Sequence, residues 1–414
     1  MEWGKEYLVD VVESLHQGLN TAGEKIKFVD AGFPIIQTRN LNNGLIDLSH
    51  KIKFMCQEDW DKYKDKYRPE VGDIFFTNIG TIGKTAIVNK CEDYLIHWNI
   101  FKIRPLPDKI ISAYLRYRLD FLTDSGFFTD SQKGGTVNFV TKKMMSSVEV
   151  PLPPIPEQKR IVAILDQAFS DIEQARAKTE QNLKNARELF ESYLQQMFSQ
   201  CGEGWVESTL AEVSIEFGRG KSKHRPRGDA SLLGGEYPLI QTGDISNSDH
   251  WITKHTRTYN DKGLNQSKLW PKGTVCIAIV GANVAETAIL NFDACFPDSV
   301  IGILLDSKLA NNEYVDYLLQ SFKSYLKEKG KGTARDNINL GTFANQKFPF
   351  PSLSEQESIV NKLSFLDAET RNLKSVYQNK LKMVDELKKT ILQKAFSGEL
   401  TKAPDKETKK GVAA

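Results

Sequence analysis

Three residues in the second half of the chain could support metal-dependent catalysis. Asp298, Asp306 and Lys308 combine two carboxylates, which can hold Mg²⁺, with a lysine that could orient a water molecule for attack. The spacing between them is short, and the matching stretch of the first half, residues 97–104, contains no acidic residue. We therefore expect a surface turn bounding a strand at Val300–Leu305, and a metal-dependent endonuclease remains the alternative.

A second pattern nearly matches the phosphate-binding P-loop, G-x-x-x-x-G-K-[ST]. It runs NIGTIGKT from Asn78 to Thr85, so an asparagine stands where the first glycine should be. The matching stretch of the second half reads Ala285-Glu286-Thr287, which lacks both the glycine and the lysine. The near match therefore does not predict nucleotide binding.

Basic residues in loops are the stronger signal, because they can neutralise phosphates or enter a groove of a nucleic acid. Arginine and asparagine can pair with guanine and adenine edges, whereas lysine mostly meets phosphate. A solvated loop is the alternative reading. The strongest cluster is Arg219, Lys221, Lys223, His224, Arg225 and Arg227, and further candidates are Arg39, Asn40, Lys133, Thr136, Lys331, Arg335 and Asn337.

Composition limits the class of protein. A chain of 414 residues with 40% hydrophobic and 26% charged residues suits two or three globular domains. It has no apolar run of membrane-spanning length and no signal peptide at its start. Its five cysteines show no C-x-x-C spacing, which argues against a disulfide framework or a zinc site. We expect a cytoplasmic protein that binds no metal, and its net charge of +2 means that any polyanion must be met by local clusters.

The sequence contains an internal repeat. Residues 157–199 align with residues 355–397 without a gap, at a constant offset of 198. Weaker matches precede both copies in the same order, including FPIIQT with YPLIQT, GKTAIVN with AETAILN, and AYLRYRL with EYVDYLL. The chain therefore alternates two related globular parts with two related helical parts.

Each globular part mixes short helical patterns with β-rich runs such as Thr85–Val88 and Val275–Ile279, which predicts an α+β fold. Each helical part lacks glycine and proline over its 43 residues and would span about 64 Å as one helix. A capping box of Ser354 and Glu357 is expected at the start of the second helix.

Apolar residues recur in both helices at alternating spacings of three and four, which is typical of a coiled coil. We expect the two helices to pack antiparallel on each other, about a pseudo-twofold axis. A second apolar edge either packs on other protein or thickens the same seam. The predicted seam residues are Ile161, Leu165, Ile172, Leu183 and Phe190 in the first helix, and Ile359, Leu363, Leu373, Leu381 and Ile391 in the second.

Two related globular parts held apart by a rigid helical spacer suit binding at two places on a repetitive polymer such as duplex DNA. Because the two parts differ in sequence, we expect an asymmetric, bipartite target. The segments PLPPIPEQKRIV (151–162) and PFPSLSEQESIV (349–360) resemble the specificity subunit of type I restriction-modification systems. The resemblance covers residues 1 to about 400. It departs only where the second copy has Ser352 and Ser354 in place of prolines.

The resemblance implies two target recognition domains separated by helical spacers. The expected segments are recognition domain 1 at 1–150, a central helical spacer at 151–200, recognition domain 2 at 201–350, a C-terminal helical spacer at 351–400 and a flexible tail at 401–414. It also implies that Lys84 contacts phosphate, because recognition domains of this family carry a similar turn.

The resemblance further implies that this chain binds double-stranded DNA and catalyses nothing. Adenine-N6 methylation would belong to two modification subunits that bind S-adenosylmethionine. ATP-dependent cleavage, with Mg²⁺, would belong to restriction subunits. The alternative is an endonuclease of the PD-(D/E)xK type built on Asp298, Asp306 and Lys308.

Overall fold

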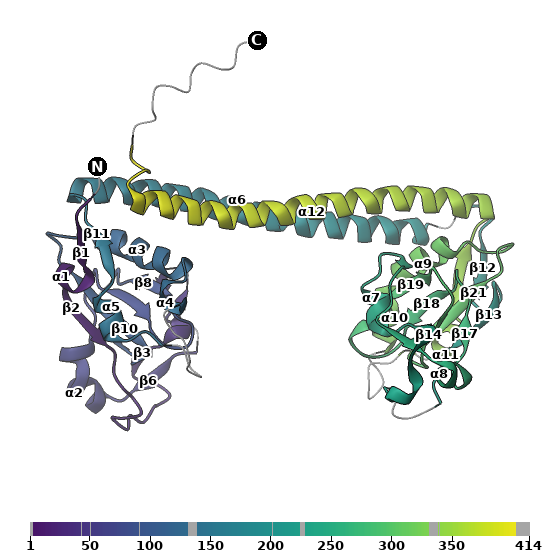
Figure 1. Ribbon diagram of the computed structural model, residues 1–414, viewed down its shortest axis with the longest axis horizontal. Coiled ribbons are helices and arrows are strands. Elements are labelled where there is room, and N and C mark those ends of the chain that lie inside the picture. Colours follow the sequence, from purple (N-terminus) through teal and green to yellow (C-terminus); the bar gives the residue numbers. More distant parts are fainter. Residues whose placement is uncertain are drawn as a thin grey trace, which may run out of the picture. The chain divides into compact units, whose positions relative to one another are not determined.

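Two compact units make up the protein in the computed structural model (Figure 1). The first comprises Met1–Thr179 and Asn379–Ala414, and the second comprises Glu180–Gln378. Each unit therefore contains one globular part and a length of each long helix. The residues described are 3–42, 44–49, 51–90, 92–130, 139–200, 202–223, 228–330, 338 and 340–402.

The globular part of the first unit is built around a four-stranded antiparallel sheet, ordered β2-β10-β7-β8. A smaller sheet, β6-β3-β9, contains one parallel and one antiparallel pair. The strands are β1 Lys5–Tyr7, β2 Val12–Gln17, β3 Phe33–Ile36, β4 Leu41–Asn42, β5 Leu45–Ile46, β6 Lys53–Met55, β7 Ile74–Thr77, β8 Thr85–Ile87, β9 Leu95–Ile96, β10 Ile100–Pro105 and β11 Glu149–Pro151. The helices are α1 Leu8–Val11, η1 Thr38–Asn40, α2 Gln57–Tyr67, α3 Ser112–Asp124, α4 Phe127–Asp130 and α5 Lys142–Ser146.

The second unit repeats this plan with one more strand in each sheet, in the orders β13-β21-β18-β19-β15 and β16-β14-β20-β17. Its strands are β12 Val206–Thr209, β13 Ser214–Arg219, β14 Leu233–Leu239, β15 Trp251–Ile252, β16 Arg257–Tyr259, β17 Leu269–Trp270, β18 Val275–Ala278, β19 Thr287–Leu290, β20 Ala294–Cys295, β21 Val300–Leu305 and β22 Lys347–Phe350. Its helices are η2 Ala230–Leu232, α7 Thr242–Ser246, α8 Asp261–Asn265, η3 Gly281–Asn283, α9 Asn312–Ser321, α10 Lys323–Gly330 and α11 Leu340–Ala344. The α+β prediction is confirmed for both globular parts.

The two long helices are α6, Ile155–Ser199, and α12, Leu353–Ser397, each of 45 residues. Both begin two residues earlier than predicted, and Pro156 fits in the first turn because no intrahelical donor is needed there. The capping prediction was wrong by two residues. Since α12 begins at Leu353, it is the Ser352 hydroxyl that accepts a hydrogen bond from the Glu355 amide, at 3.3 Å.

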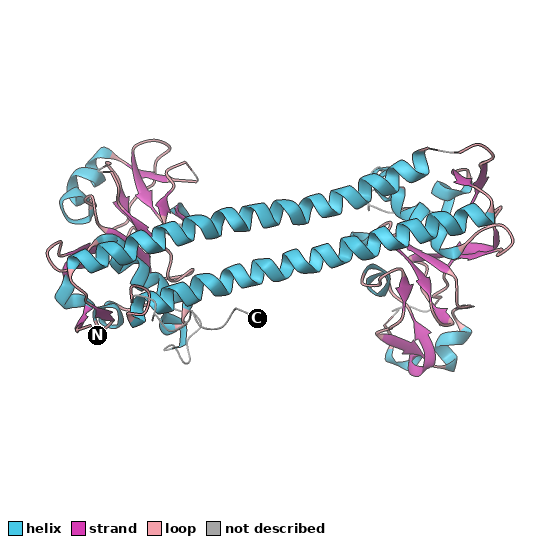
Figure 2. Cartoon of the chain, turned by 90° about the horizontal axis from the view of Figure 1, so that it is seen from above, coloured by secondary structure: helices cyan, strands magenta, loops and turns pink. Residues whose placement is uncertain are grey.

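The long helices pack antiparallel, as expected. In the first unit, Ile161 and Leu165 near the start of α6 share a hydrophobic core with Leu392 and Ala395 near the end of α12. In the second unit, the end of α6 shares a core with the start of α12. The start of each helix therefore accompanies the end of the other, and Figure 2 shows the two side by side.

Burial along the predicted seam is uneven. Ile161, Leu165, Ile172, Ile359 and Leu363 are buried, whereas Leu183, Phe190, Leu381 and Ile391 are half-buried. Leu373 differs from the prediction because its side chain is 43% exposed. At 100° per residue it is rotated about 40° from Ile359, towards the solvent edge of the helix.

The second apolar edge packs on the globular parts at both helix ends. Leu194 and Phe198 of α6 belong to the core of the second unit, and Leu392 and Phe396 of α12 belong to that of the first. The part of this edge that stays exposed is Leu189 and its repeat equivalent Leu387, at 73% and 47%.

Candidate nucleic-acid interface

A buried glutamine fastens each globular part to its long helix. Gln158 of α6 is fully buried, and its carbonyl accepts a hydrogen bond from the Ile111 amide, at 3.0 Å. Its amide donates to the backbone carbonyls of Lys109 and Pro153, both at 2.9 Å. The glutamine therefore joins the start of α3 to the proline-rich step.

Gln356 of α12 makes the same three bonds in the second unit. It accepts from the Asn311 amide at 2.8 Å and donates to the carbonyls of Leu309, at 3.1 Å, and Pro351, at 3.0 Å. This shared role gives a physical reason for the glutamine of the Glu-Gln pair in both proline-rich segments, 151–162 and 349–360. The sequence shows that these glutamines are identical in the two copies, but it does not reveal their hydrogen bonds.

A tyrosine supports the same joint in each unit. The hydroxyl of Tyr114 on α3 donates to the Pro151 carbonyl at 2.9 Å, and that of Tyr314 on α9 donates to Pro349 at 2.6 Å. The Tyr114 ring lies 5.4 Å from that of Phe396, which belongs to α12. In each unit the helix that carries the tyrosine is thus bonded to the strand before the long helix, and in the first unit the tyrosine ring also packs on α12.

The repeated Gln-Thr step forms a helix N-cap in both units. Gln37 and Asn40 form a reciprocal capping box at η1, and Gln241 and Asp244 form one at α7. Asn40 is only 1% exposed, accepting from the Gln37 amide at 3.0 Å and donating to the Asp47 carbonyl at 3.2 Å. The neighbouring Arg39 is exposed. Of this predicted pair, the structure leaves Arg39 accessible and uses the Asn40 side chain to hold the turn.

The P-loop-like turn folds on itself. The amides of Gly83 and Lys84 both donate to Thr77, to its carbonyl and its hydroxyl respectively, each at 2.9 Å. They are therefore not available to cradle a phosphate. The Lys84 ammonium group is half-buried and donates to the Asn42 side chain at 3.1 Å.

The basic cluster of the second globular part follows strand β13. Arg219 lies at the end of that strand, and Lys221 and Lys223 lie in the segment after it, all three with exposed side chains. Several candidates lie outside the described residues, namely His224, Arg225, Arg227, Lys133, Thr136, Lys331, Arg335 and Asn337.

The carboxylates of the nuclease alternative lie at opposite ends of a strand. Asp298 precedes β21 and Asp306 follows it, so a six-residue strand of about 20 Å separates them. Asp306 instead accepts a hydrogen bond from the Lys308 amide, at 2.9 Å, within a turn. Two carboxylates so far apart cannot hold one Mg²⁺ ion.

Each unit has a pocket where its globular part meets the long helices, and the two pockets occupy equivalent positions of the repeat. Both have a volume of about 520 Å³. The first is lined by residues that include Lys84, Arg116 and Lys388, and the second by residues that include Glu286, His250 and Asp367. The two copies of the repeat thus form the same pocket but line it with side chains of different charge.

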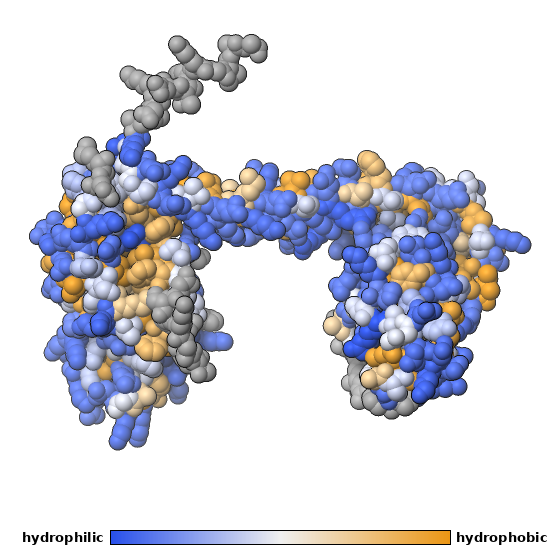
Figure 3. Space-filling view, in the orientation of Figure 1, coloured by the Kyte–Doolittle hydropathy of each residue, from blue (hydrophilic) through white to orange (hydrophobic). Residues whose placement is uncertain are grey.

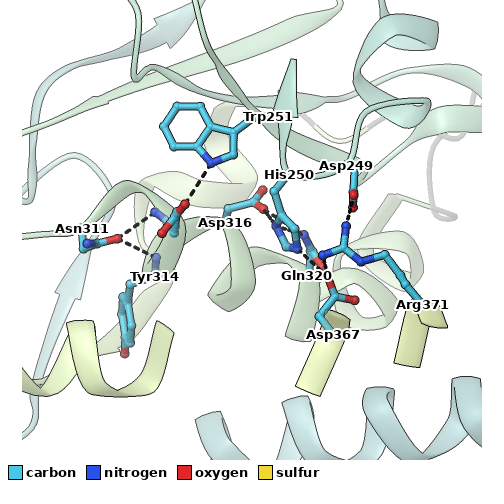
Figure 4. A network of polar contacts seen from close by, with 10 residues as sticks. Asp249, His250, Trp251, Asn311, Tyr314, Asp316, Gln320, Asp367 and Arg371 are labelled. Atoms are coloured by element: carbon cyan, nitrogen blue, oxygen red, sulfur yellow. Dashed lines mark hydrogen bonds and ion pairs between the residues drawn. The ribbon is translucent and has the colours of Figure 1, made fainter. Parts of the chain in front are cut away.

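A charged network lies beside the pocket of the second unit, and Figure 4 shows its residues. His250 Nδ1 lies 2.6 Å from Asp316 of α9, and its Nε2 lies 3.2 Å from Asp367 of α12. Arg371 of α12 pairs with Asp367 at 2.7 Å and also with Asp249. Burial lowers the pKa of His250, but the hydrogen bonds to the two carboxylates outweigh it and raise the pKa to about 9.

Sequence reasoning missed this network because its partners are remote in sequence and unlike their repeat equivalents. The ligand atoms of Asp249, His250 and Asp367 lie within 4.8 Å of one another, a spacing that a metal could use. However, the Arg371 guanidinium already pairs with both carboxylates, and a protonated histidine is not a ligand. The arrangement therefore suits an ion-pair network better than a cation site.

Comparison with known families decides the assignment. The model of the type I restriction modification DNA specificity domain matches residues 2–183 and again residues 202–383. The chain belongs to this family of type I DNA specificity proteins. The double match coincides with the internal repeat and confirms the resemblance drawn from the proline-rich and Glu-Gln segments.

Relatives and solved structures agree with this specificity family. A putative MjaX specificity subunit of Methanocaldococcus jannaschii is 24% identical, over 96% of this chain and 94% of that protein. The StySPI specificity subunit of Salmonella potsdam is 24% identical over 90% of this chain and 83% of its own. Among structures, a chain of a type I restriction-modification system aligns with a TM-score of 0.77 at 20% identity, covering 96% of this chain and 98% of that one.

The HsdS subunit from Thermoanaerobacter tengcongensis aligns with a TM-score of 0.62 at 19% identity, covering 96% of this chain and 97% of its own. These likenesses show that this specificity protein shares their fold. Within the described residues, none of the helices is both long enough and apolar enough to cross a membrane.

Proposed function

We propose that this chain is the DNA-reading specificity subunit of a type I restriction-modification complex. It reads a bipartite, asymmetric target with its two globular parts. The observation that carries the proposal is the specificity-domain match to both copies of the repeat, each copy fastened to a long helix by the same buried glutamine. The domain boundaries predicted from the sequence are part of this proposal.

The proposed DNA contacts in the first globular part are Arg39 and Lys84. The exposed Arg39 extends from a turn that Asn40 holds in place, so we assign base or phosphate contact to the arginine and a positioning role to the asparagine. Lys84 can exchange its contact with Asn42 for a phosphate oxygen, because that contact involves no charged partner.

The second globular part meets DNA through Lys221 and Lys223 and through the basic residues that follow them. Lys133, Thr136, Lys331, Arg335 and Asn337 stay predictions from the sequence, as do His224, Arg225 and Arg227. Each phosphate that a lysine or arginine neutralises steepens the dependence of binding on salt.

The proposed partners are two modification subunits and a set of restriction subunits, and the proposed location is the cytoplasm. Methyl transfer from S-adenosylmethionine and ATP-dependent cleavage would be performed by those partners, and this chain would hold no cofactor itself. Apolar residues interrupt the mostly hydrophilic covering of the long helices (Figure 3). We assign docking of the modification subunits to the equivalent exposed residues Leu189 and Leu387.

The deciding experiment is a genome-wide map of N6-methyladenine in a methylation-free host that expresses this chain with the methyltransferase encoded beside it. A split, asymmetric motif should appear, and it should vanish when this chain is omitted. Arg225→Ala combined with Arg227→Ala should relax the motif in one half-site only, with Lys308→Ala as the control that leaves it unchanged. Absence of any motif, with the methyltransferase expressed and bound, would refute the proposal.

A further inference from the structure

One residue in each unit, next to the last strand of the main sheet (β8 in the first unit) or before it (β15 in the second), has a left-handed backbone. Gly44, before β5, has a φ of +76°, and His250, before β15, has a φ of +58°. Glycine adopts this conformation without strain, whereas a histidine there needs compensating contacts. The first unit thus has the residue type that this backbone conformation favours, and the second unit has one whose backbone is strained there.

The two units also differ in what this residue meets. A Cβ atom at Gly44 would lie 2.4 Å from the Arg116 guanidinium of α3, so only glycine fits there as packed. In the second unit the repeat equivalent of Arg116 is Asp316, which is fully buried and lies 2.6 Å from His250. The imidazole thus fills the space that an arginine occupies in the first unit.

The His250 side chain links three elements. It contacts Asp316 on α9 and Asp367 on α12, and it belongs to the segment of residues 241–250. That segment starts with the Gln241 capping box, the repeat equivalent of the turn from which Arg39 extends. A displacement of His250 would therefore displace the turn that corresponds to the Arg39 turn of the first unit, relative to the long helix.

We propose that His250 is a positioning residue for DNA reading by the second globular part, because it ties residues 241–250 to both α9 and α12. This inference rests on the proposed function. The first unit has glycine at this position, so the dependence is confined to one half-site.

The carboxylates of Asp316 and Asp367 favour the protonated form of His250, and the Arg371 guanidinium, which pairs with Asp367 and Asp249, opposes it. Glu286, Lys323, Lys327 and Lys374 line the same pocket. Asp316 and Gln320 face it from α9, Asp367 and Arg371 from α12, and Asp249 from its own segment. The Tyr317 ring of α9 lies 4.4 Å from the imidazole, centroid to centroid. Deprotonation would leave the buried Asp316 carboxylate without its charged partner, so the tie should loosen at alkaline pH.

The test uses the complex of this chain with its modification subunit. Methylation rates are measured on duplexes that carry the mapped target or a single-base change in either half-site. His250→Gln should lose about tenfold in kcat/KM and in discrimination at one half-site, which corresponds to about 1.4 kcal/mol. Discrimination at the other half-site should be unchanged, and Arg39→Ala should affect that other half-site. His255→Ala is the matched control, since His255 is an exposed histidine of the same globular part.

A pH series separates positioning from general stability. Wild-type discrimination at the affected half-site should fall between pH 8 and pH 10, whereas His250→Gln should give a flat profile. If His250→Gln fails to fold, Asp367→Asn decides the question, because it takes away the charge that holds His250 to α12 and leaves the contact with Asp316 in place; it also breaks the Arg371–Asp367 ion pair within α12, for which Arg371→Gln is the control. Equal losses at both half-sites, or no loss, would overturn the inference. A wild-type complex that methylates no bipartite target would overturn the proposed function instead.

Discussion

Replacing Gln158 by alanine should loosen the first globular part from α6 without unfolding the second unit. The side chain is fully buried and makes three hydrogen bonds to the backbone of residues 109, 111 and 153. At about 1 kcal/mol for each bond, the variant loses about 3 kcal/mol of local stability. The released Ile111 amide should then exchange its hydrogen about a hundredfold faster.

Hydrogen exchange resolved at Ile111 is the appropriate assay, because a chain of two units need not unfold in a single step. Gln167→Ala is the control, since Gln167 is an exposed residue of the same helix whose amide contacts only Asp171. Gln356→Ala should produce the same change at the Asn311 amide of the second unit. If exchange at Ile111 in Gln158→Ala stays within threefold of the wild type, the glutamine clasp, meaning the three hydrogen bonds of Gln158 or Gln356, does not hold the globular part on its long helix.

Three further predictions follow from other contacts. Asp73→Ala should destabilise the first unit by about 3 kcal/mol in urea unfolding, because it removes the buried carboxylate to which Arg104 donates two hydrogen bonds and leaves that guanidinium with the exposed Glu70 as its ion-pair partner; a loss below 1 kcal/mol would contradict this. The raised pKa of His250 should stabilise the second unit by about 3 kcal/mol below pH 6.5, and this contribution should disappear as the pH rises to about 9. The free energy of unfolding of the wild type and of His250→Gln, measured at both pH values, tests this. A difference between the two proteins that does not change with pH would refute it. Leu387→Glu should weaken co-purification of the modification subunit at least tenfold while leaving the fold intact, since that side chain is 47% exposed; unchanged assembly would place the docking surface elsewhere.

Elements defined by local pattern could be predicted from the sequence. The gap-free repeat and the absence of glycine and proline located both long helices to within two residues of their starts. Strand Val300–Leu305 was predicted with its observed limits, because it is a continuous apolar run between turns. Antiparallel pairing could be predicted because the two equivalent helices lie in one chain with a globular part between them.

Roles set by remote partners could not be predicted. Asn40 has a residue type suited to reading adenine, yet its contacts with Gln37 and Asp47 bury it in a turn. His250 lies 66 residues from Asp316 and 117 from Asp367, and nothing in its local sequence marks either partner. The internal repeat did not mark it either, because the structurally equivalent residues of the first unit are Gly44 and Arg116.

The two copies differ in a way that separates support from reading. The glutamine clasp and the tyrosine bond to the proline-rich step are the same in both units, to within 0.3 Å in each corresponding distance. The pockets beside them keep their volume, but Lys84 of the first lining is replaced by Glu286 in the second, and Arg116 is replaced in the sequence by the buried Asp316. The shared contacts satisfy buried backbone groups that are the same in both units, whereas residues whose charge differs between the copies can specialise for different half-sites. Gln158→Ala and Gln356→Ala should therefore impair the half-site read by their own unit to a similar degree. Variants of the exchanged residues should impair the half-site of one unit and have no counterpart in the other.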